Sequence, residues 1–140
     1  MDADTTGWID PDTKADAREA YESLEPAAGT VVRETAKAME FDRSEYETRV
    51  TPEVIETVRD ALFASLLAVT VDSREAFEDW RAAYDGEVVE IGSENVERVV
   101  WHAPDFADEV VAATFQDEPD AAIGTLRRQA FGRLYREVVR

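Results

Sequence analysis

Apolar residues recur at every third or fourth position over most of the chain, which is the spacing of a helix with one buried face. Several apolar stretches also begin at strong helix starts, such as Thr51-Pro52-Glu53, where a capping residue precedes a proline. The pattern predicts helices over about residues 11–24, 27–41, 52–69, 72–84, 106–115 and 120–138. Ser44 and Glu47 form a capping-box pattern that predicts a short helical turn between the second and third of these helices. Asp105 is expected to cap the helix over 106–115.

The period changes between residues 87 and 102. The segments EVVEI and VERVVWH are rich in β-branched residues, and GSEN separates them, which predicts an antiparallel hairpin. An isolated hairpin is marginal in water, so it must lie on the helices or pair with the hairpin of a second subunit. The expected fold class is α+β and mostly α, with about five to six helices around one core and a single antiparallel β-hairpin (about 87–102).

The chain of 140 residues fits one domain, which we expect to span 10–140 after a flexible N-terminal segment, 1–9. The absence of cysteine excludes disulfides, thiolate zinc sites and cysteine nucleophiles. The longest apolar run, 61–71, is too short to span a bilayer, and the acidic N-terminus does not resemble a signal peptide. These features predict a cytoplasmic protein that does not enter a membrane.

The chain is strongly acidic, with 32 Asp and Glu against 15 Lys and Arg and a net charge of −17. Lysine is nearly absent from the basic residues, a balance typical of halophilic proteins. In molar KCl the Debye length falls to about 3 Å, which screens the self-repulsion. We therefore attribute much of the acidic charge to adaptation to a salt-rich habitat. We also expect the negative charge to repel nucleic acid and anionic lipid.

The stretch HAPDFADE holds the single histidine, His102. His102 with Asp105 would suit acid/base chemistry, and His102, Asp105 and Asp108 are ligand types for a divalent metal. The spacing matches neither HExxH nor a calcium loop. The alternative, which we prefer, is a strand-to-helix junction in which Asp105 caps the helix and Asp108 lies in its first turn.

The C-terminal segment 123–140 carries five arginines and one acidic residue. Arg127, Arg128 and Arg133 are candidates to bind a small anion through bidentate guanidinium contacts. The alternatives are pairing with an acidic surface in the same subunit or across a dimer, or complementing the helix dipole at the C-terminus. Gly124 and Gly132 share one face of this helix and indicate either close packing or a kink.

Four aromatic residues, Trp80, Tyr84, Trp101 and Phe115, either line a pocket for a planar ligand or form part of the core. Trp101 is therefore also a ligand-binding candidate. The signatures GxSxG, GxxxxGK and GxGxxG are absent, so nucleophilic triads, P-loops and dinucleotide sites have no support in the sequence.

The segments MEFDRSEYETRVTPEVIETVRDALFASLL and WHAPDFADEVVAATFQDEP resemble small acidic haloarchaeal proteins grouped as a family of unknown function. This resemblance implies no activity. We expect a halophilic interaction or small-ligand-binding protein without catalysis or cofactor, a homodimer whose ligand is a partner protein or a small anion. One alternative is an enzyme that uses His102 as acid/base or metal ligand and Arg127 or Arg128 to hold an anionic substrate. Another is a DNA-binding regulator that acts through the C-terminal helix.

Overall fold

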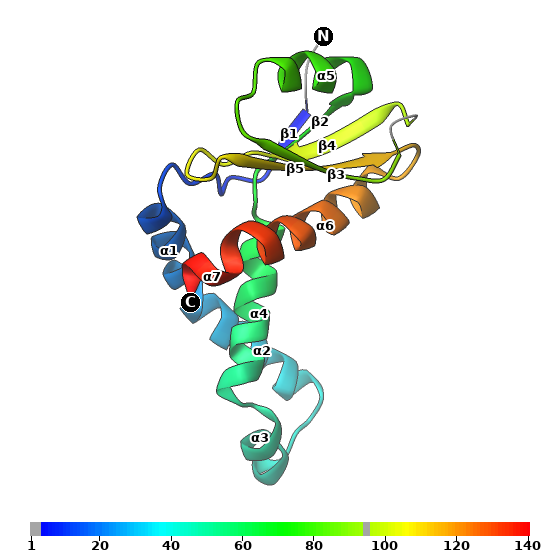
Figure 1. The fold of residues 1–140 in the computed structure, drawn as a ribbon. Helices are drawn as coiled ribbons and strands as arrows, with labels where there is room; N and C mark the ends of the chain where they lie inside the picture. The colour runs from blue at the N-terminus through cyan, green and yellow to red at the C-terminus, as the bar shows by residue number, and fades with distance from the viewer. Residues whose placement is uncertain (1–3, 94–95) are drawn as a thin grey trace.

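A five-stranded mixed β-sheet with helices on both faces makes up the upper half of the molecule (Figure 1). The computed structural model describes residues 4–93 and 96–140. The strands are β1 (Asp4–Thr6), β2 (Val69–Ser73), β3 (Glu87–Ile91), β4 (Arg98–His102) and β5 (Glu109–Phe115). The helices are α1 (Lys14–Ser23), α2 (Glu25–Ala38), α3 (Arg43–Arg49), α4 (Pro52–Ser65), α5 (Arg74–Ala82), α6 (Pro119–Ala130) and α7 (Arg136–Val139), with a π-helical segment η1 (Phe131–Tyr135) between the last two.

The sheet has the strand order β1-β2-β4-β5-β3, and only the β3–β5 pair is parallel. The α+β class is confirmed, but the prediction of a single antiparallel hairpin over 87–102 is wrong. The chain does reverse between β3 and β4, yet β5 lies between these two strands and pairs with both. Residues 94–95 of the predicted GSEN turn lie outside the described residues.

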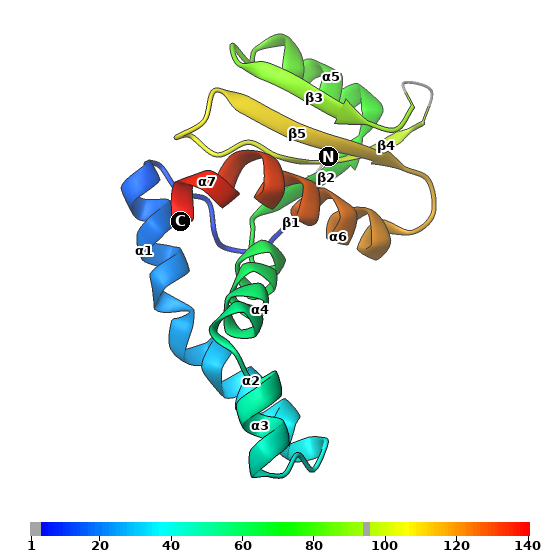
Figure 2. The ribbon, with the colours of Figure 1, turned by 60° about the horizontal axis from the view of Figure 1, so that its bottom comes forward.

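The predicted helix over 106–115, with Asp105 as its cap, is also wrong, because residues 109–115 form β5. Residues 110–113 of this strand are all buried, since α5 covers one face of the sheet and α6 the other (Figure 2). A strand buried on both faces reads as a continuous apolar run, which periodicity cannot distinguish from a short buried helix.

The predicted central helix over 52–69 ends earlier than its pattern suggests. Thr51 caps α4 as expected, with its hydroxyl oxygen accepting from the backbone N–H of Val54 at 3.2 Å. The helix stops at Ser65, and Val69–Ser73 become β2, which lies between β1 and β4 in the sheet. The alternating apolar positions Val69 and Val71 face the main core, as expected for a strand.

Two apolar clusters hold the layers together. The larger lies between the sheet and the helices α1, α4 and α6, and its largest members include Tyr21, Phe63, Leu67, Leu126 and Tyr135. The smaller lies under α5 and consists of Phe77, Val99, Trp101, Val110 and Ala112. The sheet is therefore covered on both faces, which accounts for the buried apolar residues of β4 and β5.

The N-terminal residues belong to this fold as far as they are described. Residues 4–6 pair with β2, and Ile9 is buried against Leu67. Gly7 has a φ of +90°, and a Cβ at this position would collide with the carbonyl group of Leu67. Residues 1–3 of the predicted flexible segment lie outside the described residues.

A helical arm, residues 25–58, extends away from the sheet (Figures 1 and 2). It consists of α2, α3 and the N-terminal part of α4, with α2 and α4 side by side. A capping box between Asp42 and Glu45 starts α3, two residues before the pattern at Ser44 and Glu47 suggested. The arm therefore has one layer of helices only, without a sheet to cover its sides.

Arg74, at the start of α5, joins this helix to β3 and to the loop that follows it. Its guanidinium donates to both carboxylate oxygens of Glu90, at 3.2 and 3.0 Å, and to the carbonyl oxygens of Ser93 and Val96, at 2.9 and 3.3 Å. The side chains of Arg74 and Glu90 are largely buried.

We expect Arg74→Met to lower the free energy of unfolding by about 2 kcal/mol, because Glu90 keeps its charge in a largely buried place. Urea denaturation followed by tryptophan fluorescence measures this loss. The matched control is Arg128→Met, which removes an arginine from an exposed helix surface and should change stability by less than about 0.5 kcal/mol. Equal losses for the two variants would contradict the structural role of the Arg74 cluster.

Candidate functional site

His102 lies at the end of β4, buried between the sheet and the C-terminal helix. Its Nδ1 is 2.5 Å from the carbonyl oxygen of Ala68, and its Nε2 is 2.6 Å from the hydroxyl oxygen of Tyr135. A carbonyl oxygen only accepts, so Nδ1 carries the proton and Tyr135 donates to Nε2. Burial lowers the pKa of His102 to about 4, and this ring is therefore neutral at pH 7.

The π-helical segment η1 places the Tyr135 hydroxyl at this histidine. Phe131, Leu134 and Tyr135 are all buried within these five residues. Gly132 lies in the same segment, and a Cβ added there or at Gly124 would meet only the end of an arginine side chain, at 3.9 or 3.5 Å. The two glycines thus face open space within the described chain, and the close helix packing considered for them is not seen there.

The structure does not gather the predicted acid/base and metal ligands around one point. Both ring nitrogens of His102 are used in hydrogen bonds, while Asp105 and Asp108 lie in the loop between β4 and β5. Among residues 4–93 and 96–140, no three histidine, aspartate or glutamate side chains are placed to hold a metal ion. The metal and acid/base roles of these three residues therefore gain no support from their positions.

The three candidate anion-binding arginines have separate partners. Arg127 donates to the carbonyl oxygens of Leu67 and Thr6, at 3.0 and 3.3 Å, and Arg128 donates to the hydroxyl of Thr125, at 3.3 Å. Arg133 is paired with Glu109 and with Glu87. Arg140 also pairs with acidic side chains of α4, Asp60 and Glu56. Of the five C-terminal arginines, Arg133 and Arg140 thus form ion pairs with acidic side chains of the same subunit. Arg127, Arg128 and Arg133 do not share a common anion-binding site.

The aromatic residues considered for a planar ligand mostly pack on one another. Trp101 is buried, with its ring centroid 5.1 Å from that of Phe77 and 5.6 Å from that of Trp80. Trp80 stacks on Tyr84 at 4.7 Å. Phe115 lies apart from them, next to the guanidinium of Arg98. The rings of Trp80, Tyr84 and Trp101 therefore fill the space under α5 themselves.

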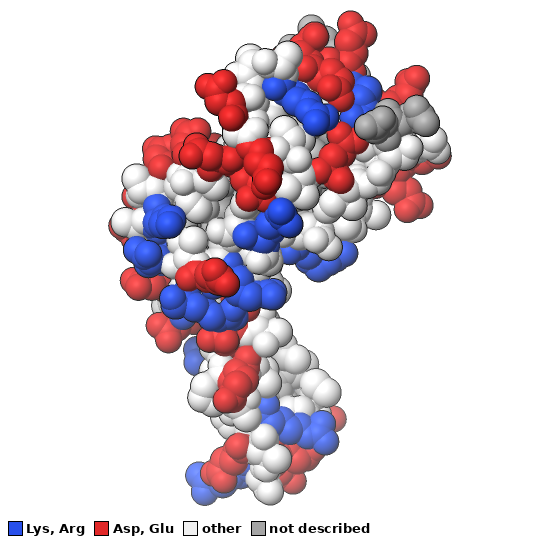
Figure 3. Space-filling model, viewed as in Figure 1, with Lys and Arg blue, Asp and Glu red and all other residues white. Residues whose placement is uncertain are grey.

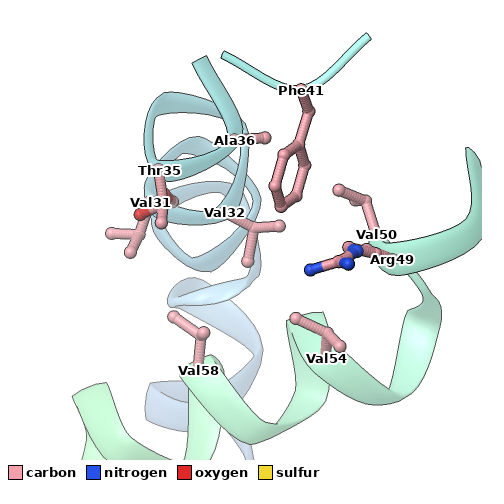
Figure 4. Close-up of a pocket in the computed structure, with 9 residues that line it drawn as sticks. All are labelled: Val31, Val32, Thr35, Ala36, Phe41, Arg49, Val50, Val54 and Val58. Carbon is pink, nitrogen blue, oxygen red and sulfur yellow. Dashed lines mark hydrogen bonds between the residues drawn. The ribbon is translucent and has the colours of Figure 1, made fainter. Parts of the chain in front are cut away.

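A pocket in the helical arm is the clearest candidate for a binding site. It is a hollow of about 230 Å³ between α2, α3 and α4, closed at one end by the loop that carries Phe41 (Figure 4). Apart from one arginine and one threonine, its walls are hydrocarbon. The residues that line it are Val31, Val32, Thr35, Ala36, Phe41, Arg49, Val50, Val54 and Val58.

The two polar side chains of the arm pocket, Thr35 and Arg49, differ in whether they already have a hydrogen-bond partner. The Thr35 hydroxyl donates to the carbonyl oxygen of Val31 at 2.7 Å, an interaction inside its own helix. The Arg49 guanidinium lies 5.4 Å from the centre of the Phe41 ring and points into the hollow (Figure 4). Within the described part of the chain, no carboxylate lies within 4.0 Å of the Arg49 guanidinium. The arm pocket is thus apolar with one unpaired cation at its wall.

Two of the residues that line the arm pocket are also exposed to solvent, Val31 at 42% and Val54 at 40%. Met39 and Tyr46 are exposed elsewhere in the arm and do not line the pocket. In the face shown by Figure 3, uncharged surface lies between the acidic and basic side chains of the arm. Adjacent exposed apolar groups on an otherwise charged protein are typical of a binding surface.

Sequence reasoning missed this pocket because it predicted one buried face along the whole helix over 52–69, which includes Val54 and Val58. That face continues past the edge of the domain, where no sheet covers it. The adjacent valines Val31 and Val32 were the available signal, because neighbouring helical positions point about 100° apart and together make a broad apolar face.

Comparison with known proteins places the chain in a family. Comparison with curated proteins and with solved structures gave no significant match. In the described part of the chain, no helix has the length and apolar character needed to cross a membrane. Residues 8–136 match the family of unknown function DUF5809, which confirms the expected membership in an uncharacterised family. The chain therefore belongs to the DUF5809 family, whose function is unknown.

Proposed function

We propose that this protein is a non-catalytic binding protein whose helical arm takes up an apolar group in the arm pocket. The observation that carries the proposal is the apolar hollow at the end of a protruding arm, with exposed Val31 and Val54 among the residues that line it. An apolar ligand would remove these side chains from water, which supplies about 25 cal/mol for each Å² of apolar surface buried.

The size of the hollow limits what it can hold. Its volume, about 230 Å³, is below the range of roughly 300–1,000 Å³ that is typical of pockets for drug-sized ligands. It suits a compact apolar molecule or a single apolar side chain better than a nucleotide or a large cofactor.

The chemistry of the wall supports binding rather than catalysis. Arg49 is the single ionisable side chain among the lining residues, and an arginine keeps its proton at all ordinary pH values. The lining set contains no acid/base residue that titrates near neutral pH and no serine, cysteine or lysine nucleophile.

The acidic composition supports a proposal about the salt concentration in which the protein works. We take the net charge of −17 as adaptation to concentrated salt inside a halophilic cell, where short-range apolar contacts keep their strength while charge interactions are screened. An apolar site is suited to such a medium. Binding experiments should accordingly be carried out in molar KCl.

The proposal is tested with the neutral fluorescent probe N-phenyl-1-naphthylamine. We expect its fluorescence to rise with the wild-type protein and the apparent Kd to increase about tenfold or more for Val54→Phe, because the larger side chain fills the hollow. Val54 is partly exposed at the pocket, so the substitution does not overfill a closed core.

Met39→Phe is the matched control, since it adds a similar ring to an exposed position of the arm outside the lining set and should leave probe binding unchanged. Equal probe binding by the wild type and Val54→Phe would reject the arm pocket as the site. Sedimentation velocity in the same buffer checks the competing explanation, self-association through the arm. A wild-type dimer that becomes monomeric in Val54→Phe would show that a second copy covers the pocket, and would overturn the proposal.

A further inference from the structure

We propose that the natural ligand of the arm pocket is a small monocarboxylate, whose hydrocarbon part fills the hollow while its carboxylate pairs with Arg49. This inference rests on the proposed function and adds the charge and the size class of the ligand. It derives from the one cation in an otherwise apolar wall.

The position of Arg49 is set by α3 and by Phe41. Arg49 is the last residue of α3, which is started by the capping box of Asp42 and Glu45. The guanidinium lies close to the Phe41 ring and is directed toward the space between Val32 and Val54 (Figure 4). A carboxylate that reached this group would have its alkyl part among the valines of α2 and α4.

Arg49 is one of several arginines that form no ion pair within the described part of the chain, and it is the one that lines the arm pocket. Arg74, Arg81, Arg133 and Arg140 each form ion pairs with glutamate or aspartate. Arg49 has no such pair within the described part of the chain, although acidic residues outnumber basic ones by about two to one. A guanidinium beside hydrocarbon binds a carboxylate through two parallel hydrogen bonds that are stronger than those between neutral groups.

The lining of the arm pocket argues for a single negative charge on the ligand. Arg49 is the one cation among the lining residues, so no second cation is present there to neutralise another charge. The Thr35 hydroxyl donates its proton inside its own helix, so Arg49 is the side chain among the lining residues that can donate hydrogen bonds to a ligand. An aliphatic or aromatic monocarboxylate fits these conditions.

The experiment compares octanoate with octanol, two probes of equal chain length that differ in charge. Isothermal titration calorimetry in molar KCl at pH 7 is carried out on the wild type, on Arg49→Gln and on Arg43→Gln. Arg43 is the matched control, because it is an exposed arginine of the same helix that does not line the pocket. Circular dichroism checks that each variant keeps its helices.

We expect the wild type to bind octanoate about fivefold more tightly than octanol, a modest preference for a charged hydrogen bond at a half-open site. Arg49→Gln should lose this preference while still binding octanol, and Arg43→Gln should keep it. Arg49→Lys should retain part of it, since the charge remains but the bidentate geometry does not.

Each other result has a distinct meaning. Equal binding of octanoate and octanol by the wild type would overturn the carboxylate assignment and leave the apolar pocket intact. A preference for octanoate that survives Arg49→Gln would show that another cation is responsible, which also overturns the assignment. If neither probe binds and N-phenyl-1-naphthylamine does not bind either, the proposed function itself fails.

Discussion

Replacing Phe63 with alanine is expected to lower the free energy of unfolding by about 3–5 kcal/mol, the usual range for a fully buried phenylalanine. The ring of Phe63 makes edge contacts with three other rings, those of Tyr21, Phe131 and Tyr135, at centroid distances of 5.7, 5.8 and 5.1 Å. These rings come from α1 and η1, while Phe63 belongs to α4. The substitution therefore opens a cavity where the helical arm joins the sheet and the C-terminal helix.

Urea unfolding in molar KCl, followed by circular dichroism, measures this loss. Phe41→Ala is the control, because Phe41 is partly exposed in the arm and should cost only about 1 kcal/mol. If Phe63→Ala does not fold, Phe63→Leu provides the same comparison with a smaller cavity. A loss at Phe63 no larger than that at Phe41 would contradict the central position assigned to this ring.

A second large effect is expected from the titration of His102. Burial lowers the pKa of this histidine to about 4 in the folded protein, while an unfolded histidine titrates near 6.5. Between these values the unfolded chain binds the proton and the folded protein does not. Stability is therefore lost as the pH falls from about 6.5 to about 4, and the full difference amounts to roughly 3 kcal/mol.

The comparison variant is His102→Gln, which does not titrate but keeps a donor and an acceptor for Ala68 and Tyr135. The free energy of unfolding is measured at intervals from pH 7 to pH 4 in molar KCl for both proteins. The wild type should lose about 3 kcal/mol relative to the variant over this interval. Because the carboxylates titrate alike in both proteins, their contribution cancels. Parallel curves would show that His102 is not a buried neutral histidine.

The partners of His102 also show how the stretch HAPDFADE is used in the fold. His102 was a candidate for catalysis because it is the single histidine and lies near acidic residues in sequence. In the structure its partners are Ala68 and Tyr135, which are 34 and 33 residues away along the chain. The sequence pattern could not identify either partner, because motif spacing finds only groups that lie close together along the chain.

The sequence by itself determined the features that depend on neighbouring residues. The start of α4 at Thr51-Pro52, the final helix from about residue 120 and the α+β class follow from capping chemistry and from helical or β-branched patterns. The match of residues 8–136 to a family of unknown function agrees with the resemblance seen in two segments.

The tertiary structure alone decided which apolar runs are strands and which faces are covered. Residues 109–115 form a strand that is buried on both faces, and burial on two sides removes the alternation that marks a strand in sequence. Residues 69–73 do alternate, but they directly follow the apolar pattern of α4, so the sequence pattern placed their first residue in that helix. β5 lies between β3 and β4, an insertion that local turn signals cannot show. The arm pocket exists because the apolar faces of α2 and α4 continue beyond the region that the sheet covers. Only the packing of segments distant in sequence determines where the sheet ends.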